Sequence, residues 1–190
     1  MPSEYFSLAV DLDGDGRRDI WGSVGDALAS AANQLKAKGW VGGRPWGIEA
    51  RVPASADCSL EGPGNMRPLA DWARLGFTRA DGKGFSAAEA SWPAYLMMPG
   101  GGYGPAFLVT DNFIALRAYN TSDLYALFVG NLADRIAGGG TFVTGWGNIG
   151  MIPAREIEET QALLKAAGAE ITKIDGRIGF GIAPKLRARL

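Results

Sequence analysis

A short acidic segment near the start of the chain constrains the fold more than any other. Residues 11–17 read Asp-Leu-Asp-Gly-Asp-Gly-Arg, with carboxylates at alternate positions and a glycine at the sixth. In a calcium loop of the EF-hand kind, alternate side chains converge on one cation, the glycine permits a sharp turn, and the seventh residue offers its backbone carbonyl. We therefore predict that Ca²⁺ binds the carboxylates of Asp11, Asp13 and Asp15 and the carbonyl oxygen of Arg17.

The second half of this loop departs from the standard pattern. Its twelfth position, which normally holds a bidentate glutamate, is Gly22. The nearest carboxylate that could complete the site is Asp26, and Asp19 is the alternative. Clustered aspartates would repel one another without a cation, which favours a metal site. The other interpretation is a solvated turn that binds no metal. Because the loop has no second copy, a cation here would brace the fold rather than signal.

The residue types present limit the chemistry of the chain. Its 190 residues include no histidine and one cysteine, Cys58. This excludes Ser-His-Asp and Cys-His catalysis, zinc sites that need imidazole, and an intramolecular disulfide. Nineteen basic and twenty acidic residues give a net charge of -1, so nothing indicates nucleic acid or an anionic membrane as a partner. We expect no membrane span, and the first residues lack the pattern of an export signal.

Apolar spacing divides the chain into helices and strands. A helix is predicted over residues 24–38, with Ser23 as its cap and Gly39 at its end. The other predicted helices cover residues 67–75, 113–116, 124–136 and 156–167. Strands are predicted at residues 46–52, 94–98 and 106–110, and the glycine-rich residues 140–153 predict a linker.

Five segments follow one another in an order that carries a family resemblance. They are the acidic loop with its helix, residues 43–47 (Gly-Arg-Pro-Trp-Gly), residues 67–72, residues 104–109 and residues 117–127 (Arg-Ala-Tyr-Asn-Thr-Ser-Asp-Leu-Tyr-Ala-Leu). To about Gly139, the chain resembles the lytic murein transglycosylase B family. The resemblance implies an α+β fold: the C-terminal part of a lysozyme-like transglycosylase domain, with an EF-hand-like calcium loop and a small β-containing subdomain.

The resemblance also implies a reaction. The family cleaves the bond between N-acetylmuramic acid and N-acetylglucosamine of peptidoglycan without water, and one glutamate acts as acid and then as base. In the family this glutamate lies upstream of the segment that Met1 begins, so we expect no catalytic residue in this chain and an upstream catalytic segment as partner. Glu49 is the one substitute considered, since burial beside Trp46 would raise the pKa of its carboxyl. The ordinary alternative is a strand glutamate that faces solvent or pairs with Arg51.

Two residues correspond to a pair that lines the glycan cleft in the family, Tyr119 and Asn120. Tyrosine can stack on a sugar face, and asparagine can donate to and accept from hydroxyl or acetamido groups. The alternative is that Asn120 or Ser122 caps the next helix while Tyr119 packs in the fold. Some relatives have a cleft tyrosine where this chain has Gln34, which would reduce the stacking surface.

The resemblance divides the chain into three parts. Residues 1–139 would be a partial lytic transglycosylase catalytic domain, residues 140–153 a Gly-rich linker, and residues 154–190 a truncated domain that resembles the small three-helix peptidoglycan-binding type. In that tail, Ile182 stands where the family usually has threonine. Peptidoglycan glycan strands would be the partner, and the periplasm or cell envelope the location. If half of a lysozyme-like domain is missing, the helices at 24–38 and 122–137 would expose apolar faces.

Two other functions remain open from the sequence. The chain could be a non-catalytic peptidoglycan-binding module that keeps the cleft around Tyr119 and Asn120. It could also be a calcium-braced structural module with no sugar partner.

Overall fold

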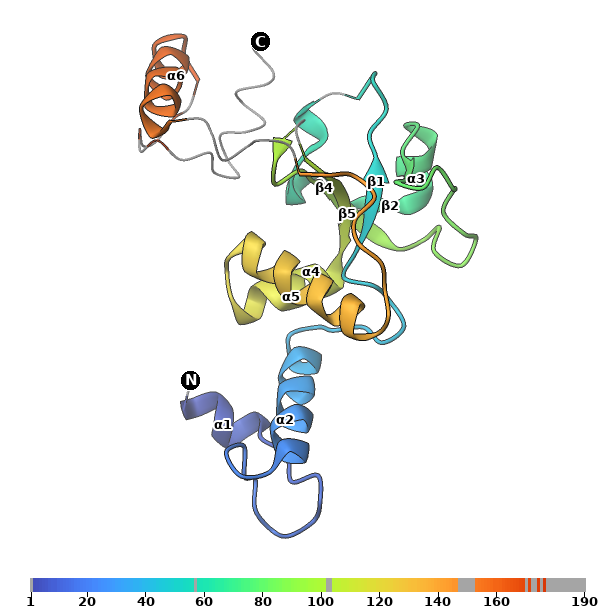
Figure 1. Ribbon diagram of the computed structural model, residues 1–190, viewed down its shortest axis with the longest axis vertical. Coiled ribbons are helices and arrows are strands. Elements are labelled where there is room, and N and C mark those ends of the chain that lie inside the picture. The colour runs from blue at the N-terminus through green and yellow to red at the C-terminus, as the bar shows by residue number, and fades with distance from the viewer. Residues whose placement is uncertain are drawn as a thin grey trace. The chain divides into compact units, whose positions relative to one another are not determined.

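The computed structural model describes residues 2–56, 58–101, 104–146 and 153–169, together with Ile171, Ile174 and Gly176. The backbone forms two compact units, each made of two stretches of chain. The first unit comprises Met1–Gly47 and Thr110–Gly139, and the second comprises Ile48–Val109 and Gly140–Leu190. Figure 1 shows that the first unit is helical and that the second contains the sheet. The sheet segment is therefore inserted between two helical segments of the sequence.

The described part of the helical unit consists of α1 (Pro2–Leu8), α2 (Val24–Ala37), α4 (Asp111–Tyr119) and α5 (Asp123–Ile136). The predicted cap of α2 is confirmed, because the Ser23 hydroxyl accepts a hydrogen bond from the Asp26 amide at 3.2 Å. Thr110 and Ser122 cap α4 and α5 in the same way. Helix α1 has only seven residues, too few for a periodic pattern, and was not predicted.

One buried amide ties the segment that follows α2 to helix α4. Asn112 is fully buried and its side chain accepts from the Val41 amide at 2.7 Å. Its amide nitrogen donates to the carbonyl oxygens of Val41 and Arg44. The Arg44 guanidinium also pairs with Asp111 at 2.7 Å. These bonds satisfy backbone groups of the turn before Trp46, which explains the value of the Gly-Arg-Pro-Trp-Gly stretch for the fold.

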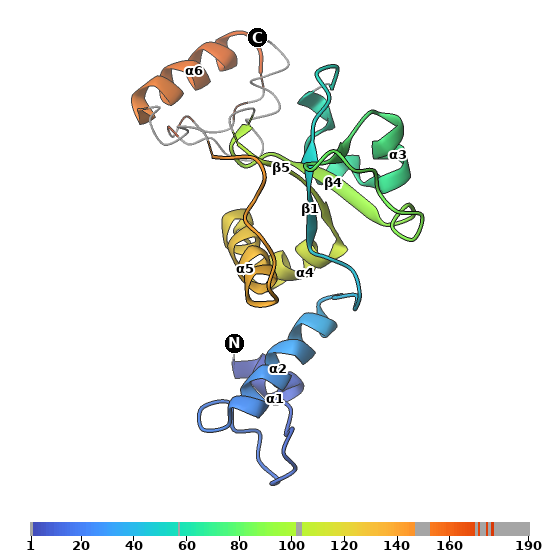
Figure 2. The ribbon, with the colours of Figure 1, turned by 45° about the vertical axis from the view of Figure 1, so that its right-hand side comes forward.

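The second unit is built on a five-stranded sheet. Its strands are β1 (Gly47–Arg51), β2 (Arg67–Pro68), β3 (Thr78–Arg79), β4 (Pro93–Met97) and β5 (Ala106–Thr110), in the order β2-β4-β5-β1-β3. β1 pairs antiparallel with β3, and β2 with β4. Figure 2 shows the strands from a second direction. The three longer strands confirm the predicted ones, whereas β2 and β3 have two residues each and were missed.

One face of this sheet packs against helix α3 (Leu69–Arg74), near the short 3-10 helices η1 (Cys58–Leu60) and η2 (Pro63–Asn65). Trp72 of α3 is fully buried and donates its indole N–H to the Ala94 carbonyl at 2.9 Å. Its ring meets Phe77 edge-on, and the Arg67 guanidinium lies 4.9 Å from its centre. This core includes Ile48 and Ala50 of β1, the strand that carries Glu49.

The last described element is helix α6 (Ala154–Ala166). Gln161 of α6 is fully buried and accepts from the Gly176 amide at 3.1 Å. Residues 177–190, including Ile182, lie outside the described residues. The observed helices and strands agree with the predicted α+β class. The two compact units are defined by backbone packing, and their boundaries do not test the three segments expected from the family resemblance. The division into residues 1–139, 140–153 and 154–190 therefore remains a prediction. Within the described residues, no helix is long and apolar enough to cross a bilayer.

Candidate functional site

The acidic loop brings three carboxylates together. Asp11, Asp13 and Asp26 each place a carboxylate oxygen within 4.8 Å of the other two. Asp11 and Asp13 come from the loop, and Asp26 comes from the first turn of α2. Oxygen atoms from several carboxylates at such spacing are the donor set that Ca²⁺ prefers. The residues present therefore fit a calcium ion.

The loop backbone wraps around the Asp11 carboxylate. Asp11 accepts hydrogen bonds from the Gly14 amide at 2.7 Å and the Gly16 amide at 2.9 Å. Both glycines have positive φ, 78° and 87°, which other residues adopt only with strain. The Asp15 carboxylate accepts from the Arg17 amide at 2.8 Å and is not in the group of three. The sequence thus predicted the loop, and the structure gathers two of its three predicted side-chain ligands.

Asp26, rather than Asp19, completes the group. Asp26 is only 1% exposed, and its carboxylate accepts from the Leu12 amide at 2.8 Å and the Asp19 amide at 2.9 Å. The Leu12 N–H contributes most to holding the pKa of Asp26 below its usual value; burial opposes this effect. The Asp19 carboxylate instead accepts from the Trp21 and Gly22 amides.

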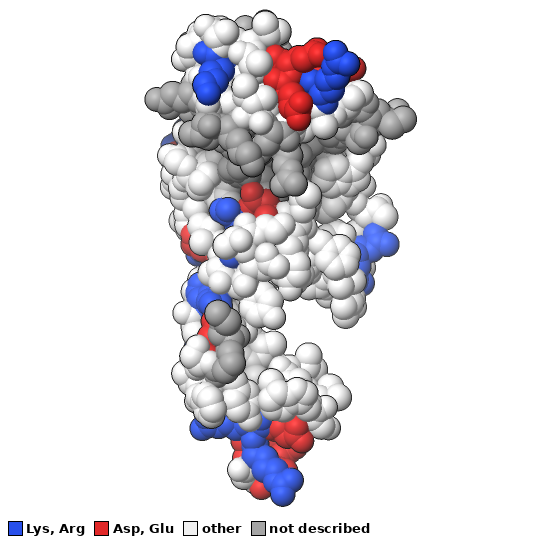
Figure 3. Space-filling view, turned by 90° about the vertical axis from the view of Figure 1, so that its left-hand side faces the viewer, with Lys and Arg blue, Asp and Glu red and all other residues white. Residues whose placement is uncertain are grey.

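Gly22, where the standard loop has its glutamate, has little room for a side chain. A Cβ atom there would lie 2.5 Å from Asp19 Oδ2. Any larger residue would therefore have to displace the Asp19 carboxylate. Around this loop, acidic and basic side chains gather at one end of the helical unit, as Figure 3 shows.

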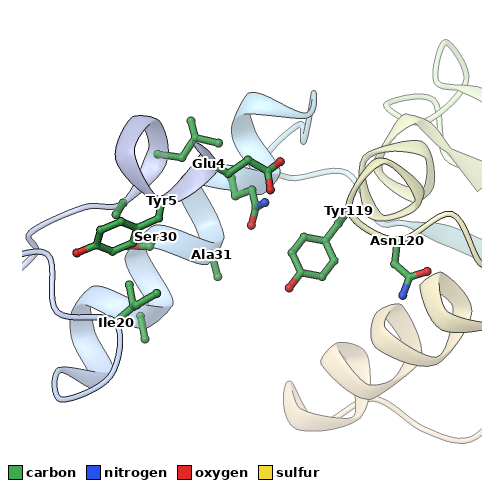
Figure 4. A pocket seen from close by; sticks show the side chains of 11 residues that line it. Glu4, Tyr5, Ile20, Ser30, Ala31, Tyr119 and Asn120 are labelled. Carbon is green, nitrogen blue, oxygen red and sulfur yellow. The ribbon is translucent and has the colours of Figure 1, made fainter. Parts of the chain in front are cut away.

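The helical unit also contains a cleft of about 550 Å³. Tyr119 and Asn120 lie on one side of it, and Glu4, Tyr5 and residues of α2 on the other (Figure 4). The remaining lining residues are Leu8, Ala9, Ile20, Ala27, Ser30, Ala31 and Gln34. The structure therefore brings the predicted substrate pair together with residues between Glu4 and Gln34, which lie more than 80 positions earlier in the sequence.

Tyr119 and Asn120 combine features of both predicted interpretations. The Tyr119 side chain is 54% exposed, and its ring stacks on Tyr125 at a centroid distance of 6.3 Å. Asn120 is exposed and accepts from the Ser122 amide at 3.1 Å, while Ser122 itself caps α5. Ser122 is thus the cap, and Asn120 orders the turn before it. Both residues still present polar and aromatic groups to the cleft.

Sequence reasoning missed Glu4, a carboxylate that lines the same cleft. Its side chain pairs with the Lys38 ammonium at 3.1 Å. The hydrogen bond from Lys38 is the main cause that lowers the pKa of Glu4 below its usual value. The carboxylate is therefore ionised at neutral pH and suits the role of hydrogen-bond acceptor better than that of acid. No sequence pattern indicated it, because α1 is short and Lys38 lies 34 residues away.

Glu49, the predicted low-probability substitute for the acid, uses its carboxylate in two backbone hydrogen bonds. Its carboxylate accepts from the Val143 amide at 2.8 Å and from the Thr144 amide at 2.7 Å. Phe142 beside them packs edge-on against the buried Phe107 of β5, with ring centres 4.9 Å apart. Glu49 therefore fastens residues 142–144 to the sheet. It neither lines the cleft nor pairs with Arg51 among the described contacts.

Comparison with known proteins identifies the family. The family model "Transglycosylase SLT domain" matches residues 1–134. The membrane-bound lytic murein transglycosylase B of Escherichia coli K12 is 33% identical over 150 residues, which cover 72% of this chain and 36% of that protein. The chain belongs to the lytic transglycosylase family. The resemblance read from the sequence is confirmed.

Solved structures agree with this assignment. SltB3 from Pseudomonas aeruginosa in complex with NAG-NAM-pentapeptide is 44% identical, with a TM-score of 0.87 over 100% of this chain and 51% of its own. Another SltB3 structure contains NAG-anhNAM-pentapeptide. Escherichia coli Slt35 in complex with calcium is 28% identical, with a TM-score of 0.54 over 72% of this chain and 42% of its own. The chain thus spans about half the length of these proteins or less, and the lysozyme-like α+β fold class is confirmed.

Proposed function

We propose that this chain forms the glycan-binding, calcium-bearing part of a peptidoglycan lytic transglycosylase, and that the acid of the reaction comes from a segment outside these 190 residues. The observation that carries the proposal is the cleft of about 550 Å³ that gathers Tyr119 and Asn120 with Glu4. Among the described residues, neither Glu4 nor Glu49 suits the role of the acid. Glu4 is ion-paired with a lowered pKa, and Glu49 holds two backbone amides.

The cleft offers the groups that an N-acetylated sugar needs. The exposed Tyr119 ring can stack on the apolar face of a sugar, and its partner Tyr125 holds it in place. The amides of Asn120 and Gln34 can pair with acetamido and hydroxyl groups, and Glu4 can accept from hydroxyls. The SltB3 complexes with NAG-NAM-pentapeptide and NAG-anhNAM-pentapeptide support a glycan of the same class here.

Calcium is the proposed structural cofactor. Its ligands would be the carboxylates of Asp11, Asp13, Asp15 and Asp26 and the carbonyl oxygen of Arg17. The converging oxygens of Asp11, Asp13 and Asp26 support this set, and so does the calcium complex of Slt35. When bound, the ion would neutralise the clustered carboxylates and fix the loop against α2. An ordered loop would in turn hold α2 in place, and residues of α2 form one wall of the cleft.

The proposed place of action is the periplasm or cell envelope, where peptidoglycan lies. The name of the Escherichia coli relative, a membrane-bound lytic murein transglycosylase, supports this location. The three-part division of the chain belongs to the same proposal. In it, residues 154–190 resemble a peptidoglycan-binding domain, of which α6 and the Gly176 contact with Gln161 are described.

Two assays test the function. Purified chain with Ca²⁺ is titrated with a GlcNAc-MurNAc-peptide fragment, and the same protein is incubated with peptidoglycan sacculi while anhydromuropeptides are measured. We expect binding without release. Tyr119→Ala should weaken binding about tenfold, roughly 1.4 kcal/mol, because it removes the ring that we propose stacks on the sugar. The control Phe128→Ala removes an aromatic ring of α5 that is 64% exposed and does not line the cleft, so the affinity should stay within threefold.

Each assay has an outcome that contradicts the proposal. Release of anhydromuropeptides by the chain alone would show that it contains the acid. Absence of binding by folded, calcium-loaded protein would leave the calcium-braced structural module as the better description. Equal affinities for Tyr119→Ala and the unchanged chain would remove Tyr119 from the glycan site.

A further inference from the structure

An ion pair joins the two helices on either side of the turn that carries Tyr119 and Asn120. Arg117 lies in the last turn of α4, and Asp123 is the first residue of α5. Their side chains meet across the turn, with Arg117 Nε 2.5 Å from Asp123 Oδ1. Neither of these two described residues lines the cleft, so the pair can act on a bound glycan only through the turn itself.

Two further described contacts cross the same turn. The Asn120 side chain accepts a hydrogen bond from the Ser122 amide at 3.1 Å. The Tyr119 ring stacks on Tyr125, with 17° between the ring planes. Together with the ion pair, these contacts limit how far the end of α4 and the start of α5 can separate or rotate. They therefore also limit the directions of the Tyr119 ring and the Asn120 amide.

Stability alone does not account for the ion pair. Both side chains are largely withdrawn from water, since 33% of Arg117 and 20% of Asp123 remain exposed. Burial raises the pKa of the Asp123 carboxyl above its usual value, and the Arg117 charge opposes this effect only in part. A carboxyl with a raised pKa is harder to ionise in the folded chain than in the unfolded chain. At neutral pH the charge of Asp123 therefore disfavours folding.

A fixed turn favours sugar binding, because Tyr119 and Asn120 are both exposed and would otherwise have to be ordered by the ligand. We propose that Arg117 and Asp123 are positioning residues of the glycan site. Their ion pair holds the turn between α4 and α5 so that the Tyr119 ring and the Asn120 amide already face the cleft in the free chain. This inference rests on the proposed function, in which Tyr119 and Asn120 contact the glycan.

Glycan titration of single and double variants tests this role. The full chain with Ca²⁺ is titrated with a GlcNAc-MurNAc-peptide fragment by calorimetry. Asp123→Asn and Arg117→Met each remove one charge and keep a side chain of similar size. Each should weaken binding at least about fivefold, as expected when two side chains must be ordered on binding. The double variant should bind as weakly as either single variant, because both changes remove the same interaction.

The matched control is an ion pair at the other end of α4. Arg44 pairs with Asp111 at 2.7 Å, with 19% and 38% of their side chains exposed, and neither is among the described residues that line the cleft. Asp111→Asn should therefore keep the glycan affinity within about twofold. In urea unfolding, Asp123→Asn should keep the midpoint within about 0.3 M or raise it, because the lost charge disfavoured folding. A purely structural pair would show a lower midpoint and an unchanged affinity.

Hydrogen exchange of the Ser122 amide measures the order of the turn without any glycan. Its hydrogen bond to Asn120 should open more often once the ion pair is removed. Asp123→Asn should therefore speed its exchange at least about threefold. Circular dichroism checks that each variant folds, and Arg117→Met carries the test if Asp123→Asn does not fold.

Four results would overturn the positioning role. They are unchanged glycan affinity in both single variants, an equal loss in Asp111→Asn, a loss in the double variant that is the product of the two single losses, and unchanged exchange of the Ser122 amide. Glycan binding that the variants leave intact would refute the positioning role alone. Absence of binding by the folded, unchanged chain would refute the proposed function, and the exchange rates would still show whether the ion pair orders the turn.

Discussion

Replacing Gly130 by alanine should destabilise the helical unit by about 1–3 kcal/mol. A Cβ atom at this position of α5 would lie 2.6–2.8 Å from three ring atoms of Trp46, where carbon atoms normally stay about 3.5–4.0 Å apart. Trp46 is 4% exposed and donates its indole N–H to Asp134 at 2.7 Å, so the ring has little freedom to retreat. Overpacking costs about 1–3 kcal/mol, strain on the indole hydrogen bond adds about 1, and the better helix propensity of alanine returns about 1.

Urea unfolding followed by tryptophan fluorescence measures this change, with the slope of the transition expected to stay constant. The matched control is Gly25→Ala in α2, a glycine of another described α-helix. There the new Cβ would meet Leu12 at 3.4 Å, an ordinary contact, so the control should be neutral or stabilise by up to about 1 kcal/mol. If Gly130→Ala were as stable as the unchanged protein, α5 and Trp46 could separate at no cost. The close packing of Gly130 against the Trp46 ring would then contribute nothing measurable to stability.

Two further predictions concern the acidic loop at residues 11–17 and the segment at residues 142–144 that Glu49 holds. Asp13→Asn should weaken Ca²⁺ binding, measured by calorimetry, at least tenfold, because it removes one of the three converging negative charges. Asp19→Asn should change the affinity less than twofold, because the Asp19 carboxylate accepts hydrogen bonds from the Trp21 and Gly22 amides and is not in that group. Similar losses in both variants would contradict the ligand assignment. Glu49→Gln should speed hydrogen exchange of the Val143 and Thr144 amides at least tenfold, because they lose a charged acceptor worth ~1.5–3 kcal/mol. Unchanged exchange would mean that the aromatic contact alone holds the segment.

Local sequence signals predicted those parts of the structure that depend on neighbouring residues. The spacing of Asp11, Asp13 and Gly16 indicated a loop because the hydrogen bonds that form it join residues at most five positions apart. Ser23 reported the start of α2 because a cap bond spans three residues. Strand β1 was visible as an alternation of apolar and polar residues because its burial alternates along the strand, whereas β4 and β5 are buried along nearly their whole length.

Signals that depend on distant partners could not be read in this way. The partners of Glu49 lie 94 and 95 residues away, and nothing in the composition of a glycine-rich stretch shows that its amides will meet a strand carboxylate. Glu4 joins the cleft only because α1 packs on α2 and the α4–α5 turn lies opposite. Asp26 could be proposed as a ligand by proximity, whereas its burial and its bonds to two loop amides required the fold.

The inserted sheet also bears on how the helical unit folds. Residues 48–109 separate its two stretches, and closing a flexible loop of 62 residues costs roughly 3–4 kcal/mol of chain entropy. Strands β1 and β5 are neighbours in the sheet, so once they pair, Trp46 and Thr110 meet at the loop ends and the Thr110 amide bonds to the Trp46 carbonyl at 3.0 Å. Pairing of β1 with β5 would then bring the ends of α2 and α4 close in space before the two helices pack. Substitutions that weaken the β1–β5 pairing should slow the folding of helices that they do not touch.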